Sequence, residues 1–397
     1  MTRTKDFDKD NCLLLLGSVL LFFAVLELAL ALFWPHKVIS RPYHEQYHPV
    51  MGWVNKPHMA GPVKVFGSRN VLFQRTHNSR GLRSLREFAP VKPADVRRVL
   101  LLGDSFFWGY GVDDREVLSE VLQGMVGRDV EVINGAVMAY ATDQELLWLT
   151  EEGMRYRPDL VVLGVFPAND LEDIGVSVMM GYPKPFFSLR DGKLRLENVP
   201  VPDTRETRRK AFDEPDTSLG KLKKFLRHHT HTYPFIAGRL NAVPSIRRFL
   251  LRTGLADEYT AALPGIPLIK LNEDKALGLF AALVAEIRNV CDKADAGLLI
   301  VHIPRKEQDG RSRPHAYTGV DAGAAAANAR MSAYLGGIAA RNAIPYLDLL
   351  PVVRSRQERE ELLYVPGGYD HHWTPLGHRT AAEALFAWMS ANGWTGK

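Results

Sequence analysis

The sequence is poor in cysteine, since Cys12 and Cys291 are the only two among 397 residues. Cys12 lies in an apolar segment near the N-terminus and Cys291 in a predicted helix. The sequence therefore excludes a disulfide within the body of the chain. We expect Cys291 to be an isolated, buried thiol.

Signals for nucleotide, nucleic-acid and metal binding are also lacking. The sequence contains no Gly-rich phosphate loop, no zinc-finger spacing and no basic region with interleaved aromatic residues. The formal net charge of +5 is mild and does not by itself indicate a nucleic-acid partner. Asp104, His371, His372 and His378 resemble a metal-binding set, but no converging carboxylates accompany them. We expect no metal, no organic cofactor and no nucleic acid.

Short apolar runs alternate with helical patterns through most of the chain. The patterns predict strands at residues 98–102, 130–134, 160–165, 297–303 and 345–349, and helices at 114–125, 142–156, 275–293, 322–341 and 374–391. This alternation predicts an α/β fold with a doubly wound parallel sheet and helices on both faces. An apolar content of 46% is enough to build its core.

The first of these strands ends at Gly103 and leads through Asp104 to Ser105. A serine at a strand-to-helix switch lies at the carboxyl end of a parallel sheet, where α/β folds bind their ligands. Ser105 is therefore the candidate nucleophile, and it needs a base. It does not fit the nucleophile elbow of α/β-hydrolases, because Phe107 stands where the second glycine of Gly-x-Ser-x-Gly is required.

A candidate base lies near the other end of the chain. Asp370 and His372 are two residues apart, so in an extended segment their side chains point the same way and form one unit. His371 points away from His372 in such a segment and is the fallback base. His378 lies near the start of the last predicted helix, where we expect a structural role.

Together these stretches resemble the SGNH, or GDSL-type, serine hydrolase family. Gly103-Asp104-Ser105 matches its first block, and Asp370-x-His372 matches its last, in the variant with the aspartate two rather than three residues before the histidine. The resemblance implies a five-stranded sheet of flavodoxin-like order. It also implies that Ser105 is the nucleophile, His372 the base and Asp370 the group that orients the base.

Two further stretches extend the resemblance and imply an oxyanion hole. Residues 134–144 resemble the second block, whose glycine amide falls on Ala136 in this chain. Residues 166–170 resemble the third block, with Pro167 where the family often has glycine and with Asn169 retained. The resemblance thus implies three donors to the oxyanion: the backbone amides of Ser105 and Ala136, and the side chain of Asn169.

The N-terminus predicts a membrane anchor. After a tail at residues 1–11, residues 12–34 are apolar except for Ser18 and Glu27, which is long enough to cross a bilayer. A cleaved signal peptide remains the alternative. Glu27 either faces a partner helix or lies near enough to one end to reach water. Three basic residues before the segment and two soon after it favour a single-pass protein of the inner membrane with its body in the periplasm.

The rest of the chain divides into an accessory segment and the main body. Residues 35–97 predict short strands and turns, and residues 98–397 form the hydrolase-like body, which contains an insertion at 170–274. Helical patterns at 219–228 and 241–253 predict that this insertion is helical. Basic residues are frequent in it, which indicates either a solvated helix face or a basic surface for an anionic polysaccharide or lipid head groups.

These features predict a membrane-anchored extracytoplasmic serine esterase acting on acyl, and most simply acetyl, esters of cell-envelope or exported glycans. Two alternatives stay open. If a sugar hydroxyl takes the acyl group from Ser105, the protein is a glycan O-acetyltransferase working beside a multi-spanning membrane acyltransferase. The other alternative is a non-catalytic envelope scaffold that keeps the fold.

Overall fold

The chain folds into two compact units in a computed structural model. The structure describes residues 9–33, 45–64, 72–179, 182–204, 217–241, 245–246, 249–250, 253, 271–306, 322–365 and 372–395. The larger unit contains residues 41–204 and 259–397, and the smaller contains residues 1–40 and 205–258.

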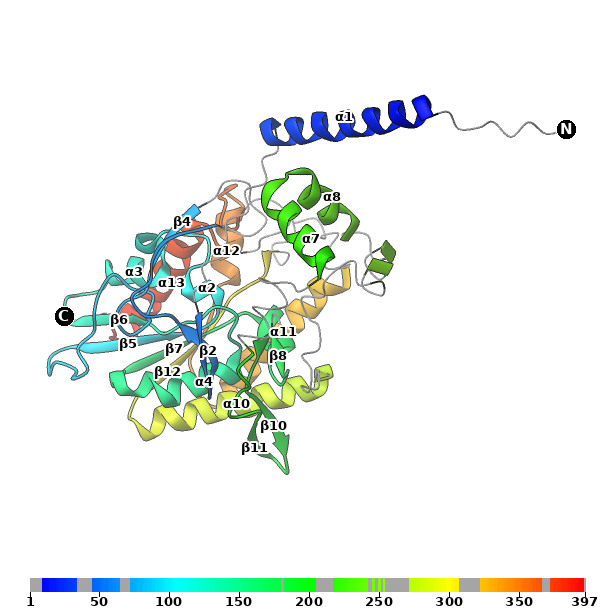
Figure 1. Cartoon of the computed structure of the whole chain (residues 1–397). Coiled ribbons are helices and arrows are strands. Elements are labelled where there is room, and N and C mark those ends of the chain that lie inside the picture. Colours follow the sequence, from blue (N-terminus) through cyan, green and yellow to red (C-terminus); the bar gives the residue numbers. More distant parts are fainter. Residues whose placement is uncertain are drawn as a thin grey trace. The chain divides into compact units, whose positions relative to one another are not determined.

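A five-stranded parallel sheet forms the centre of the larger unit (Figure 1). Its strands lie in the order β13-β12-β7-β5-β6. When the five strands are numbered along the chain and the sheet is read from β6, the order is 2-1-3-4-5. The predicted flavodoxin-like arrangement is therefore confirmed. The bounds of the strands are β5 Arg97–Leu102, β6 Val130–Asn134, β7 Leu160–Val165, β12 Gly297–His302 and β13 Tyr346–Asp348.

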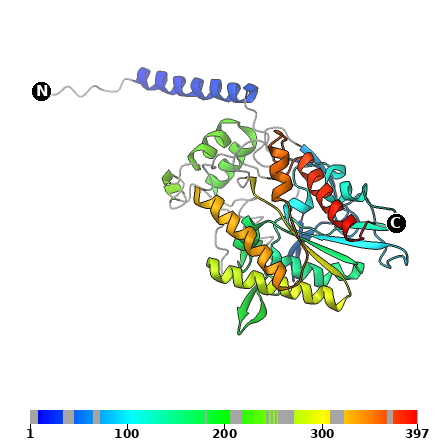
Figure 2. The same ribbon diagram turned by 180° about the vertical axis from the view of Figure 1, so that it is seen from behind.

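Helices cover both faces of this sheet, as a doubly wound fold requires (Figures 1 and 2). Side chains that alternate along each strand enter two separate apolar clusters, because successive strand residues point to opposite faces. One cluster packs against α4 Thr142–Glu151, α10 Glu273–Lys293 and α11 Ala322–Arg341. The other packs against α3 Leu118–Gln123, α12 Leu350–Gln357 and α13 Pro375–Ala391. The expected isolated thiol, Cys291, is buried in the first cluster.

Two hairpins lie in the described part of the accessory segment. Strands β1 Glu45–His48 and β2 Gly52–Asn55 form one, and β3 Ala60–Lys64 and β4 Leu72–Thr76 form the other. The first hairpin holds the loop after β6. Trp53 Nε1 donates to the Met138 carbonyl at 3.0 Å, and Asn55 Nδ2 donates to the Ala136 carbonyl at 3.1 Å. The accessory segment thus packs against the body and supports the loop that follows β6.

The insertion contains strands, which the sequence did not predict. Residues 178–197 contain the hairpins β8 Val178–Met179 with β9 Tyr182–Pro183, and β10 Phe186–Arg190 with β11 Lys193–Glu197. These belong to the larger unit. Two helices, α7 Ser218–His229 and α8 Thr232–Asn241, follow in the smaller unit. The first agrees with the predicted helix at 219–228, the second was not predicted, and most of 242–253 lies outside the described residues.

The smaller unit also contains α1 Lys9–Phe33. This helix coincides closely with the predicted segment 12–34. It is long and apolar enough to cross a membrane by length and composition.

Candidate active site

Ser105 begins a short helix directly after β5. This helix, α2 Ser105–Trp108, ends at Gly109 in the left-handed conformation, and the Asp104 side chain caps its first turn by accepting from Phe106 N at 2.8 Å. The helix is too short for a periodic pattern to reveal. As its first residue, Ser105 has a backbone N–H without a partner among the described residues, which leaves this amide available to a ligand.

Phe107 explains why the turn differs from a nucleophile elbow. Its ring lies against β7 at Gly164, where a Cβ atom would approach the ring to 2.6 Å. Phe107, two positions after the candidate nucleophile, is therefore a core side chain that fits a glycine on the neighbouring strand.

The structure brings His372 to Ser105 across 267 positions of sequence. His372 Nε2 lies 2.7 Å from Ser105 Oγ, which is hydrogen-bond distance. The His372 carbonyl accepts from Val365 N at 2.9 Å, and Trp373 forms an antiparallel bridge with Tyr364. These contacts attach the histidine to the segment before it. Asp370 and His371, the predicted orienting group and fallback base, lie outside the described residues.

Asn169 approaches the candidate site from the helix that follows β7. It lies on α5 Pro167–Asp173, and Pro167 at the first helical position is a start signal for this helix that our prediction overlooked. Asn169 Nδ2 donates to Asp104 Oδ2 at 2.6 Å. An amide nitrogen carries two hydrogens, so one bond to Asp104 leaves the second for a ligand.

Asp104 holds this amide from a buried position. Its side chain accepts from Phe106 N and Asn169 Nδ2, and the residue is 1% exposed. Burial raises the pKa of Asp104, while the two hydrogen bonds and the nearby His372 oppose that rise. The two N–H donors fit an ionised carboxylate, which accepts but cannot donate.

Ala136 does not fit the oxyanion role that the resemblance implied. Its N–H donates to Asn134 Oδ1 at 3.1 Å, and the residue is fully buried. Three residues further, Ala139 adopts a left-handed φ of 59° and is partly exposed, and its N–H has no partner among the described residues. The loop that carries it approaches Ser105, because Val137 N donates to the Gly103 carbonyl at 3.1 Å. Counting along the sequence cannot reveal which amide is already bonded.

Several ionisable side chains lie buried around α4 and α5. Lys184 Nζ donates to Asp143 Oδ1 at 2.9 Å and to the Asp173 carbonyl at 2.7 Å, and both Lys184 and Asp143 are fully buried. Burial, aided by neighbouring carboxylates, raises the pKa of Glu145 and Asp170 well above the usual range. The Lys184 ammonium therefore pairs directly with the Asp143 carboxylate, and the raised pKa values of Glu145 and Asp170 favour the uncharged forms of these two carboxyl groups.

His378 has the structural role that its position predicted. It is 1% exposed, and its Nδ1 accepts from Leu118 N at 3.3 Å, which joins α13 to α3. Burial, followed by the charges of Arg83 and His372, lowers the pKa of His378 to about 3. A histidine that stays neutral and accepts a backbone hydrogen bond is a packing group here.

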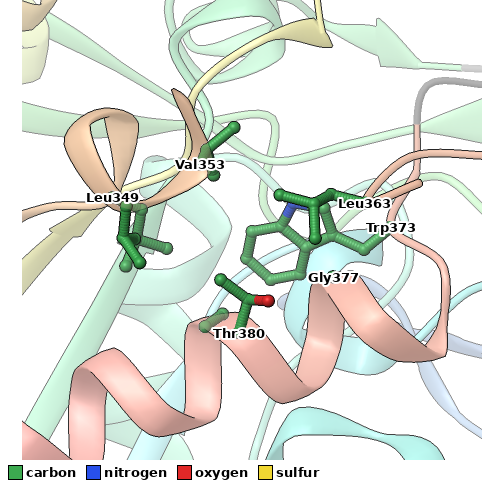
Figure 3. Close-up of a pocket in the computed structure, with 8 residues that line it drawn as sticks. Leu349, Val353, Leu363, Trp373, Gly377 and Thr380 are labelled. Carbon is green, nitrogen blue, oxygen red and sulfur yellow. The ribbon is translucent and has the colours of Figure 1, made fainter. Parts of the chain in front are cut away.

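An apolar pocket lies behind Trp373, the residue after His372 (Figure 3). It lies between α12 and α13, and all but one of its larger side chains are apolar, the exception being Thr380. Gly377 lets α13 approach closely, since a Cβ atom there would lie 2.2 Å from the Leu363 carbonyl oxygen. The lining contains no ionisable side chain, and its one hydroxyl, that of Thr380, donates to the Leu376 carbonyl at 2.8 Å. This pocket therefore supports the histidine segment and is not a site of chemistry.

Comparison with known proteins finds no matching family model and no matching curated protein. Among solved structures, the chain is similar to an α/β hydrolase from the metagenome of Lake Arreo (11% identity, 77% of this chain and 99% of that one, TM-score 0.39). It is also similar to a GDSL-like lipase from Bacteroides thetaiotaomicron (14%, 77% and 92%, 0.36) and to an acetyl-xylooligosaccharide esterase from Geobacillus (10%, 75% and 95%, 0.37).

These values are low, so the chemistry is judged from the site itself. The structure places a serine hydroxyl, an imidazole and an oriented side-chain amide at the carboxyl end of a parallel sheet. Such an arrangement can activate an oxygen nucleophile and stabilise an oxyanion.

Proposed function

We propose that this protein is an SGNH-type serine hydrolase that cleaves acyl esters through an acyl-enzyme on Ser105. The observation that carries the proposal is the 2.7 Å separation of Ser105 Oγ and His372 Nε2. A serine hydroxyl is a weak nucleophile until a base within hydrogen-bond reach accepts its proton.

The proposed reaction has two steps. In the first, Ser105 Oγ attacks the ester carbonyl while His372 Nε2 takes the serine proton. His372 then delivers that proton to the departing alkoxide, which leaves the acyl group on Ser105. In the second, water attacks the acyl-enzyme, gives a proton to His372, and the carboxylic acid leaves as Ser105 regains its proton. The proposed role of Asp370 is to hold the imidazole tautomer and to stabilise the imidazolium that each step creates.

Three donors are proposed for the oxyanion. They are the Ser105 amide, the second hydrogen of Asn169 Nδ2, and the Ala139 amide in place of Ala136. Support comes from the N–H groups of Ser105 and Ala139, which have no partner in the described part of the chain, and from the bond that orients Asn169. Each such donor typically contributes about 3 kcal/mol to the stability of the transition state.

We also propose that the enzyme is anchored in the inner membrane by α1 and acts outside the cytoplasm. The length and apolar composition of α1 support this, together with basic residues that are more numerous before its apolar segment, residues 12–34, than soon after it. An acyl ester on a cell-envelope or exported glycan is the substrate class that this location favours.

The test is active-site labelling of the full-length protein. A fluorophosphonate should add one label, found on Ser105 by mass spectrometry, and the protein should hydrolyse small nitrophenyl esters. Ser105→Ala should abolish both, whereas Ser188→Ala, at a serine bonded to Glu197 on the β10–β11 hairpin, should change neither. Labelling that survives Ser105→Ala, or no labelling and no turnover in the unaltered protein, refutes the proposal.

A further inference from the structure

Helix α7 has apolar and basic residues on opposite sides. At helical spacing, Leu219, Leu222, Phe225 and Leu226 share one side, and Lys221 and Lys223 lie outside it. The helix contains no acidic residue between positions 218 and 229. A basic amphipathic helix of this kind is typical of membrane surfaces.

The apolar side of α7 is exposed. Leu219, Leu222 and Phe225 are 49%, 53% and 57% exposed. In a soluble protein the apolar stripe of a surface helix normally faces the core. Because this stripe does not, it indicates an interaction surface for another apolar partner. The only further described ring against it is that of His229, whose centroid lies 4.7 Å from that of Phe225.

Glu27 joins α1 to α8, the helix that directly follows α7. Its two carboxylate oxygens accept from His231 N at 2.6 Å and Thr232 N at 2.8 Å, so it caps the start of α8. Leu30, one turn further along α1, is 7% exposed, whereas the side chains at residues 11–25 are exposed to solvent. The acidic residue in the apolar helix therefore has its partner within this chain, and α8 is held against the end of α1.

This contact sets how deep the junction between α7 and α8 lies in the bilayer that α1 is proposed to cross. Glu27 lies six residues before Phe33, the end of α1, which corresponds to about 9 Å along the helix. Interfacial helices bury their apolar side about 5–10 Å into the boundary between head groups and acyl chains. If the end of α1 leaves the bilayer, the start of α8 lies within that boundary.

We propose that α7 lies in the surface of the bilayer that α1 crosses, with Leu219, Leu222 and Phe225 among the acyl chains and its basic residues among anionic head groups. The proposal rests on the proposed membrane anchoring. Lipid is favoured over a protein partner because the helix combines an exposed apolar stripe with exclusively basic charge, which anionic leaflets attract. Helix α8, which follows α7 directly, contacts α1 through Glu27, so the proposed anchor brings the bilayer close to α7.

The experiment measures the depth of spin labels on α7 in the full-length protein. Cys12→Ser leaves Cys291 as the sole native thiol, which is buried and has its pKa raised to about 12. Leu219→Cys and the matched control Lys221→Cys then add one label each to opposite sides of the helix. The protein is placed in nanodiscs of phosphatidylcholine and phosphatidylglycerol. We expect the ratio of oxygen collisions to nickel-chelate collisions to be severalfold higher at position 219 than at position 221.

Each other outcome overturns the proposal. Equal, water-like ratios at both positions mean that α7 is not in the membrane. A label at 219 that is exposed to water in nanodiscs but shielded in native membranes assigns the apolar side to a protein partner. Intact mass showing that α1 has been removed excludes the anchoring. Fluorophosphonate labelling of Ser105 is measured in the same samples, so loss of the esterase assignment is recognised separately, and retained labelling shows that the variants are folded.

Discussion

Asn169 Nδ2 donates to Asp104 Oδ2 at 2.6 Å, which connects the residue directly before the proposed nucleophile to the side chain proposed to meet the oxyanion. Because an ionised Asp104 only accepts, it determines which end of the amide faces it. Asp104 is thus a positioning residue for a donor that comes from another strand.

Asp104→Asn should therefore impair catalysis, although the new side chain has the same shape as the old one. The NH₂ group of the new residue would oppose that of Asn169 and favour a flipped amide, which presents an oxygen to the developing oxyanion. We expect kcat for nitrophenyl esters to fall about 10²–10³-fold with KM little changed. Steady-state kinetics measure this.

The control for this prediction is Asn169→Ala, alone and combined with Asp104→Asn. If Asp104 acts through Asn169, the double variant loses little more than either single one. Losses that multiply would contradict the positioning role.

Ala139→Gly should preserve the active site and stabilise the fold. A left-handed φ of 59° is unfavourable for alanine and natural for glycine, so we expect a gain of about 0.5–1 kcal/mol in the free energy of unfolding. Activity should be retained, and Ala139→Val, which resists this backbone conformation more strongly, should lower kcat. Urea unfolding and ester hydrolysis measure the two effects.

The matched control is Ala136→Gly, at a buried position whose φ is not left-handed. This change should destabilise the fold by roughly 1 kcal/mol. The predicted backbone strain at Ala139 is contradicted if Ala139→Gly destabilises the protein and Ala136→Gly does not.

Lys184→Met should destabilise the protein by about 3–5 kcal/mol, because it leaves the buried Asp143 carboxylate without its ammonium partner. Asp143→Asn combined with Lys184→Met should cost less than the sum of the single changes, with a coupling of about 1–3 kcal/mol. Arg155→Met, which removes an exposed pair with Glu152, should stay within about 0.5 kcal/mol. Additive losses at Asp143 and Lys184 in urea unfolding would exclude the coupling.

His378 should make the fold less stable in acid. Its pKa is lowered to about 3 from the usual 6.5, so between these values the unfolded chain binds a proton that the folded protein does not. The free energy of unfolding should therefore fall as pH decreases from 6.5 towards 3, by on the order of 1 kcal/mol per pH unit from this group. His378→Asn, which keeps an acceptor near Nδ1 but does not titrate in this range, should remove that contribution. The difference between the two proteins in urea unfolding from pH 7 to 4 is the measurement, and a constant difference would contradict it.

Strand patterns were reliable here, whereas short helices and backbone conformations were not. The predicted ranges 130–134 and 160–165 agree with β6 and β7 because buried parallel strands are continuous apolar runs. Helices α2 and α5 are too short for a helical period, although both carry site residues. The sequence prediction assigned an oxyanion donor to Ala136, and our proposal moves it to Ala139, because neither φ nor a bonded N–H can be read from residue order.

The amino-acid sequence by itself determined where the apolar strands lie, and hence that Ser105 follows one of them at the edge where α/β folds bind ligands. Only the tertiary structure decided which groups meet there. Parallel pairing aligns the ends of β5 and β7, which brings Asn169 to Asp104, and the bridge at Trp373 holds His372 2.7 Å from Ser105. Contacts across 65 and 267 positions depend on sheet register and loop anchoring, which local sequence patterns do not encode.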